Sequence, residues 1–123
     1  ELSDSIHDVA YVEYQVQLKQ GRLKSLTCAL SSEGIHNGLI GVELVAPDGA
    51  IALQSSMDLA SLNLHLPVIF DLENLVVPRD ATWHVRFFTR STWPVYVLEF
   101  AEYSRFGWRR RVIAPFLKIE YAR

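Results

Sequence analysis

Residues 39–54, LIGVELVAPDGAIALQ, carry the clearest fold signal in the chain. Two apolar runs flank the tripeptide Pro47-Asp48-Gly49. Proline presets φ at the first central position of a tight turn, and aspartate and glycine are favoured at the positions that follow. Apolar strands joined by such a turn are typical of a β-hairpin. The stretch therefore predicts two antiparallel strands.

The segments 10–18 and 82–90 alternate in the same way between apolar and polar residues. In the first, one face would hold Ala10, Val12, Tyr14, Val16 and Leu18. In the second, Trp83, Val85 and Phe87 share one face, and the opposite face holds His84, Arg86, Phe88 and Arg90. A period of two with one apolar face indicates half-buried antiparallel strands.

The rest of the chain continues the pattern with local irregularities. Leu26, Cys28 and Leu30 form an apolar line from which Leu23 is out of phase, so we expect a bulge there. Further strands are predicted over 66–72, 95–100 and 116–122, the first of them starting at Pro67 or lying at a sheet edge. A loop is expected over 31–38, which ends in Asn37-Gly38. Residues 55–63 give no clear strand signal and are compatible with one helical turn.

These segments amount to about eight short strands, with turn signals roughly every 8–12 residues and no long helix. That spacing predicts an all-β fold, an antiparallel β-sandwich that is jelly-roll-like. A chain of 123 residues suits one domain over 1–123. The expected core residues, buried between the two sheets, are Val42 or Leu44, Phe70, Trp83, Val85 and Phe87.

Composition indicates the compartment of the domain and its relation to membranes and to a larger protein. The single cysteine, Cys28, excludes an internal disulfide and favours a reducing, cytoplasmic compartment. No apolar run approaches the roughly 20 residues that span a bilayer, so we expect no membrane span in this segment. The chain begins at Glu1 and its one methionine is Met57. We therefore expect a domain excised from a larger protein.

Signatures of catalysis are missing from the sequence. It holds no phosphate loop, dinucleotide fingerprint, His-x-x-x-His pair or nucleophile elbow. Cys28 lies among apolar residues, as expected of a buried, inert thiol, and the four histidines (His7, His36, His65 and His84) lack a metal-ligand spacing. Asp48 and Asp58 suit either ordinary turns or calcium ligation. We predict no enzyme activity, cofactor or metal.

Residues 102–116, EYSRFGWRRRVIAPF, combine arginines with aromatic residues. Ser104 and Gly107 break the alternation, so the stretch is predicted to be a loop. An aromatic platform edged by guanidinium groups suits a saccharide or a protein partner, and the alternative is a plug that caps the sandwich. The candidate ligand-binding residues are Trp108, Tyr103, Trp93, Arg105 and Arg109. Net charge is −2, which disfavours nucleic acid.

The order of strands and turns from Arg22 to Phe100 resembles a known family. Its elements are Asn37-Gly38 before a strand, Asp48-Gly49 closing a hairpin, PVIFDLENLVVPRDATWHVRFFT (67–89), and WPVYVLEF (93–100). The layout is similar to that of the jelly-roll accessory domains of bacterial glycosyltransferases and polysaccharide-synthesis proteins. It also resembles the O-antigen-binding domain of polysaccharide ABC exporters. No site residue is carried over from either family.

The resemblance implies a noncatalytic, carbohydrate-binding module. Its expected partners are a saccharide and the catalytic domain of the parent protein. The alternative is a structural or protein-interaction domain without a ligand of its own.

Overall fold

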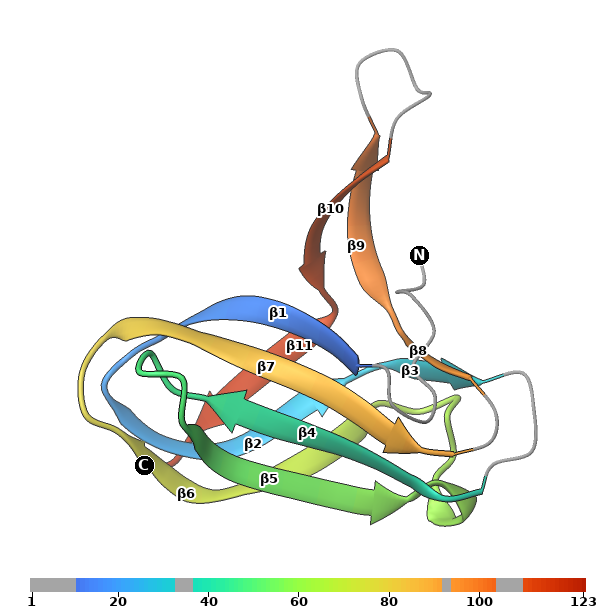
Figure 1. The fold of residues 1–123 in the computed structure, drawn as a ribbon, viewed down its shortest axis with the longest axis horizontal. Coiled ribbons are helices and arrows are strands. Elements are labelled where there is room, and N and C mark those ends of the chain that lie inside the picture. The colour runs from blue at the N-terminus through green and yellow to red at the C-terminus, as the bar shows by residue number, and fades with distance from the viewer. Residues whose placement is uncertain (1–10, 33–36, 92–93, 104–109) are drawn as a thin grey trace.

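The computed structural model describes residues 11–32, 37–91, 94–103 and 110–123, and for 99–103 and 110–115 it describes the backbone path alone. This part of the chain is almost entirely extended (Figure 1). Its one helical element is the 3-10 turn η1 (Leu59–Ser61). The strands are Tyr11–Leu18 (β1), Gly21–Cys28 (β2), Leu30–Ser32 (β3), Leu39–Val45 (β4), Ile51–Asp58 (β5), Val68–Val77 (β6), Ala81–Arg90 (β7), Val95–Val97 (β8), Glu99–Tyr103 (β9), Arg110–Pro115 (β10) and Leu117–Tyr121 (β11).

Two antiparallel sheets face each other across the core. One has the order β1-β7-β4-β5 and the other the order β11-β2-β6. The pair β3–β8 continues the second sheet, so the chain crosses between the sheets at the β1–β2, β3–β4, β5–β6, β6–β7 and β7–β8 connections, and neither sheet is a simple meander. The predicted all-β antiparallel sandwich is confirmed. The strand count exceeds the expected eight because short interruptions divide predicted strands and because β10 lies in a segment predicted to be a loop.

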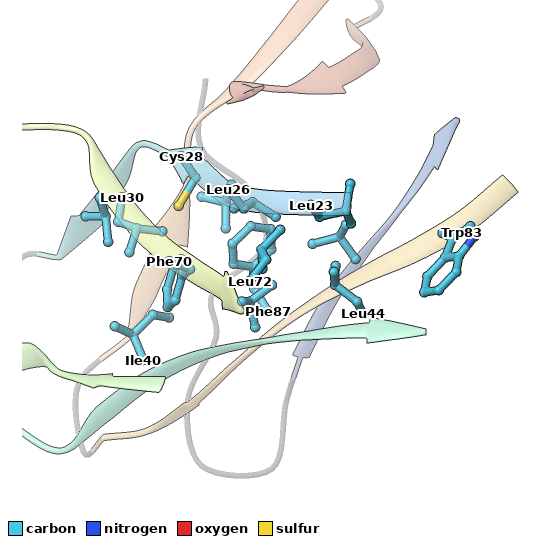
Figure 2. Packing of buried hydrophobic residues seen from close by; sticks show 14 of the residues in the cluster. Leu23, Leu26, Cys28, Leu30, Ile40, Leu44, Phe70, Leu72, Trp83 and Phe87 are labelled. Atoms are coloured by element: carbon cyan, nitrogen blue, oxygen red, sulfur yellow. The ribbon is translucent and has the colours of Figure 1, made fainter. Parts of the chain in front are cut away.

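One continuous apolar cluster fills the space between the sheets (Figure 2). Every residue expected in the core is buried there: Val42, Leu44, Phe70, Trp83, Val85 and Phe87. The alternation explains this result, because Trp83, Val85, Phe87 and Thr89 are buried while the intervening residues of β7 are not. Tyr14 of β1 adds an edge-to-face contact with Phe87, with ring centroids 6.1 Å apart. Such a pair stabilises the sandwich beyond the area it buries.

The predicted bulge is present on β2. Its pairing with β6 shifts register between Leu23 and Ser25, and its pairing with β11 shifts between Glu120 and Tyr121. On β6, Glu73 and Asn74 have φ of 54° and 56° and interrupt the alternation. The register shift between Leu23 and Ser25 changes the alternation along β2, so Leu23 is fully buried although it is out of phase with Leu26.

Local turns follow the sequence closely. Gly49 N–H donates to the Ala46 carbonyl at 2.9 Å and closes the β4–β5 hairpin. Residues 55–63 do contain one helical turn, η1. It is capped by the Asp58 carboxylate, which accepts from Ala60 N–H at 2.9 Å. Strand β6 begins directly after Pro67, which lacks an N–H to donate.

The final strand of the second sheet is divided by a hairpin. Strand β8 pairs with β3 and β11 pairs with β2, so β8 and β11 follow each other along the same neighbour. At the junction, Leu98 N–H donates to the Ala29 carbonyl, and Phe116 N–H donates to the Leu98 carbonyl at 2.8 Å. Strands β9 and β10 pair with each other between these two points and leave the sandwich as a projecting ribbon (Figure 1).

The prediction of a loop throughout 102–116 is therefore wrong at both ends. Glu102 and Tyr103 belong to β9, and Arg110–Pro115 forms β10. The prediction relied on the rule that unpaired arginines stay out of a sandwich core. A ribbon outside the sandwich is not subject to that rule, so backbone pairing can continue through the arginines.

Candidate functional site

The residues that the sequence singled out for ligand binding are mostly not described by the structure. Trp93, Arg105, Trp108 and Arg109 lie outside the described residues. Tyr103 is the last residue of β9, where its backbone partner is Arg110. The binding platform and the plug both stay predictions for this segment.

A different set of residues gathers on the sheet β1-β7-β4-β5. We call the side of this sheet that points away from the core the outer face. Strand register places Tyr11, Phe88 and Gly41 in one row across it. The next row holds Glu13, Arg86, Glu43 and Gln54. An aromatic row thus lies directly beside a charged row.

The ring of Phe88 lies over Gly41. A Cβ atom added at Gly41 would fall 2.6 Å from Cε1 of that ring and 2.8 Å from Cε2. Only glycine leaves room for the Phe88 ring to pack against the sheet at this point. Tyr11, the cross-strand partner of Phe88, is 55% exposed. The two residues make the outer face aromatic along this row.

Arg86 lies at the centre of the charged row. Its Nη2 is 3.1 Å from Glu13 Oε1, and its Nη1 is 3.8 Å from Glu43 Oε1. The guanidinium carbon is 4.8 Å from the centre of the Tyr11 ring, within the range of a cation–π contact. Two carboxylates and one guanidinium leave this row with a net charge of −1. The two carboxylates supply hydrogen-bond acceptors, which a guanidinium lacks.

Further polar side chains lie in or near this row on the outer face. Gln54 Nε2 donates to Glu43 Oε2 at 3.4 Å. His84 Nδ1 lies 3.9 Å from Glu13 Oε1, and Gln17 Nε2 donates to Thr82 Oγ1 at 2.6 Å. The outer face thus offers amide, imidazole and carboxylate groups beside an aromatic row.

The remaining chemical candidates have local structural roles. Asp48 Oδ1 accepts from Ala50 N–H at 2.9 Å, and Asp58 caps η1, so both carboxylates hold turns. In the described part of the chain, no three His, Cys, Asp or Glu side chains gather as a metal site would require. Burial raises the pKa of Cys28 to about 12, so its thiol stays protonated at neutral pH. The predicted burial of this thiol is confirmed.

The sequence signal for the outer face was present but incomplete. Alternation assigned Glu13 to the polar side of its strand and grouped His84, Arg86 and Phe88 together. Which strands are neighbours, and with what register, cannot be read from alternation. The sequence therefore did not predict that Arg86 lies between Glu13 and Glu43.

Within the described residues, no helix has the length and apolarity needed to cross a bilayer. Comparison of the chain with protein-family models, curated proteins and solved structures found no match.

Proposed function

We propose that the chain is a noncatalytic, carbohydrate-binding β-sandwich module of a bacterial glycosyltransferase or polysaccharide-synthesis protein, and that it holds the saccharide on the outer face. The observation that carries the proposal is the aromatic row of Phe88, laid over Gly41, and Tyr11 beside the Glu13–Arg86–Glu43 row. The resemblance to jelly-roll accessory domains supplies the family context.

The chemistry of a sugar ring matches these two rows. The C–H face of a pyranose is apolar and stacks on an aromatic ring. Its hydroxyl groups donate to carboxylates and to amide oxygens, and they accept from amide N–H groups. Both kinds of partner lie in adjacent rows of the outer face, which supports binding of a chain of sugar units.

The noncatalytic part of the proposal is supported by the burial of the Cys28 thiol and the pairing of the Glu13 and Glu43 carboxylates. The only thiol is buried and protonated, so it is unsuited to nucleophilic attack. Glu13 and Glu43 are both engaged with Arg86, which makes them parts of a charge network. A general acid–base pair needs groups free to exchange protons with a substrate.

A pair of substitutions tests the proposal. A glycan array screened with the wild-type chain identifies a ligand, and titration calorimetry then gives its Kd. Phe88→Ala should raise that Kd at least fivefold, because a stacked ring contributes about 1 kcal/mol. Gly41→Ala should do the same without removing any ligand contact, because its new Cβ displaces the Phe88 ring.

Ser56→Ala is the matched control, since Ser56 lies in the same row on β5 and is exposed. Its Kd should stay within twofold of the wild-type value. Wild-type affinity in both Phe88→Ala and Gly41→Ala, or no glycan bound by the wild-type chain, would refute the proposal.

The projecting ribbon favours a second candidate function, that of a protein-interaction domain. Strands β9 and β10 pair only with each other among the described strands. An isolated two-stranded hairpin is marginally stable in water, so a partner surface would stabilise it. Coexpression with the remainder of the parent polypeptide tests this function. The intact chain should copurify with it, and a chain lacking residues 99–115 should not.

A further inference from the structure

One end of the sandwich holds a pocket that is separate from the outer face. The β4–β5 turn and the β6–β7 turn line an open pocket of about 250 Å³ there. The polar groups of the pocket come from Asp48 and Arg79. Its apolar lining consists of Ala46, Pro47, Pro78, Ala81 and Trp83. Ligand pockets of drug-like size start near 300 Å³. This pocket therefore has room for one small ring.

Trp83 brings a nearly buried indole ring to the lining of the pocket. The residue is only 4% exposed, and within the described residues its indole N–H has no hydrogen-bond partner. Buried tryptophan N–H groups usually find a partner, because leaving one unpaired costs free energy. Figure 2 shows Trp83 at the margin of the cluster, beyond Leu44, with its nitrogen on the side turned away from Phe70 and Phe87. The donor is thus directed away from the apolar core.

The other lining residues add rigidity and polar chemistry. Pro47 and Pro78 have fixed φ and present apolar rings. Asp48 is held in place because its Oδ1 accepts from Ala50 N–H. Arg79 forms no ion pair within the described residues. The pocket thus combines apolar walls with one carboxylate acceptor and two donors, the Arg79 guanidinium and the Trp83 indole.

We infer that this end pocket binds a single neutral sugar unit, such as the terminal residue of a glycan. The C–H face of the sugar lies against the proline rings, and its hydroxyl groups donate to Asp48. An oxygen of the sugar accepts from the indole N–H of Trp83, and Arg79 donates to a further hydroxyl. The inference rests on the proposed function for its ligand class, but its site shares no residue with the outer face.

The test is a titration of the intact, ¹⁵N-labelled chain with glucose, galactose, mannose and N-acetylglucosamine. The indole N–H of Trp83 gives its own resonance, which is assigned by comparison with Trp93→Phe and Trp108→Phe. We expect one of these sugars to shift that resonance in a saturable way. Asp48→Asn keeps an oxygen for Ala50 N–H and should weaken the sugar at least tenfold. Arg79→Ala should weaken it as well.

Phe88→Ala on the outer face is the control and should leave this titration unchanged. A Trp83 resonance that none of the four sugars shifts would overturn the inference. Equal affinity in the wild-type chain, Asp48→Asn and Arg79→Ala would also overturn it. Failure of oligosaccharide binding at the outer face with a retained monosaccharide shift at Trp83 would refute the outer-face site and leave the pocket supported.

Discussion

Gly38 and Gly49 have nearly the same backbone conformation in different surroundings. Their φ angles are 81° and 89°, in the left-handed region that favours glycine. A Cβ at Gly38 would fall on the backbone carbonyl of Arg90, whereas a Cβ at Gly49 would meet nothing within 4 Å. Alanine substitutions at these two positions therefore separate the energetic cost of backbone strain from the cost of a steric clash.

We predict that Gly49→Ala lowers the free energy of unfolding by about 1–2 kcal/mol, the cost of left-handed backbone alone. Gly38→Ala should cost more than about 3 kcal/mol, because the Arg90 carbonyl must also move, and with it the end of β7. Urea unfolding of the two variants measures both values. Equal losses would show that the close approach of Gly38 to Arg90 is absent.

Cys28 makes stability depend on pH in the alkaline range. Burial raises its pKa from 9.0 to about 12, so between these values the unfolded chain loses a proton that the folded chain keeps. Stability from the protonated thiol is thus fully present below about pH 9 and declines as pH rises toward 12. We predict that between about pH 8 and about pH 10 the wild-type chain loses about 1 kcal/mol more stability than Cys28→Ala does. Parallel losses measured by urea unfolding would contradict the raised pKa.

At the scale of elements, the hairpin β9–β10 is an insertion in an otherwise continuous strand. Leu98 N–H donates to the Ala29 carbonyl, and Leu117 pairs with Cys28. Phe116 N–H donates to the Leu98 carbonyl. The two ends of the insertion thus lie next to each other on the second sheet. In the described part of the chain, β8 pairs with β3 and β11 pairs with β2, and neither pairing involves β9 or β10.

We predict that a chain lacking residues 99–115, with Leu98 joined to Phe116, stays folded and unfolds within about 1 kcal/mol of the wild-type chain. Phe87→Ala is the comparison, because truncating a fully buried aromatic residue costs about 3–5 kcal/mol. The same deletion should keep glycan affinity if the outer face binds the ligand. A deletion that costs as much as Phe87→Ala would show that the ribbon supports the core.

Sequence alone predicted most of the elements, and the reasons for its errors are local. Alternation identified β1 and β7 because each has a core side and a solvent side. It also detected the slip at Leu23. It missed β10 because strand pairing outside a core leaves no apolar period, and composition then suggested a loop.

For the whole molecule, sequence predicts the sandwich but not the order of its strands. Apolar alternation is a property of one strand, whereas β1-β7-β4-β5 over β11-β2-β6 is set by contacts between distant segments. The candidate site has the same limitation. Clustered tryptophans and arginines are visible in sequence, but Glu13, Arg86 and Glu43 come from three different strands and meet only through register.

The central claim is that a saccharide binds on the outer face. The most direct measurement is a ¹⁵N NMR titration of the intact chain with the oligosaccharide selected by the array, mapping shifts of backbone amides. We predict the largest shifts at Tyr11, Gly41, Arg86 and Phe88, and small shifts along β2 and β6 on the opposite sheet. Shifts confined to residues 103–110, or no shift anywhere, would contradict the account.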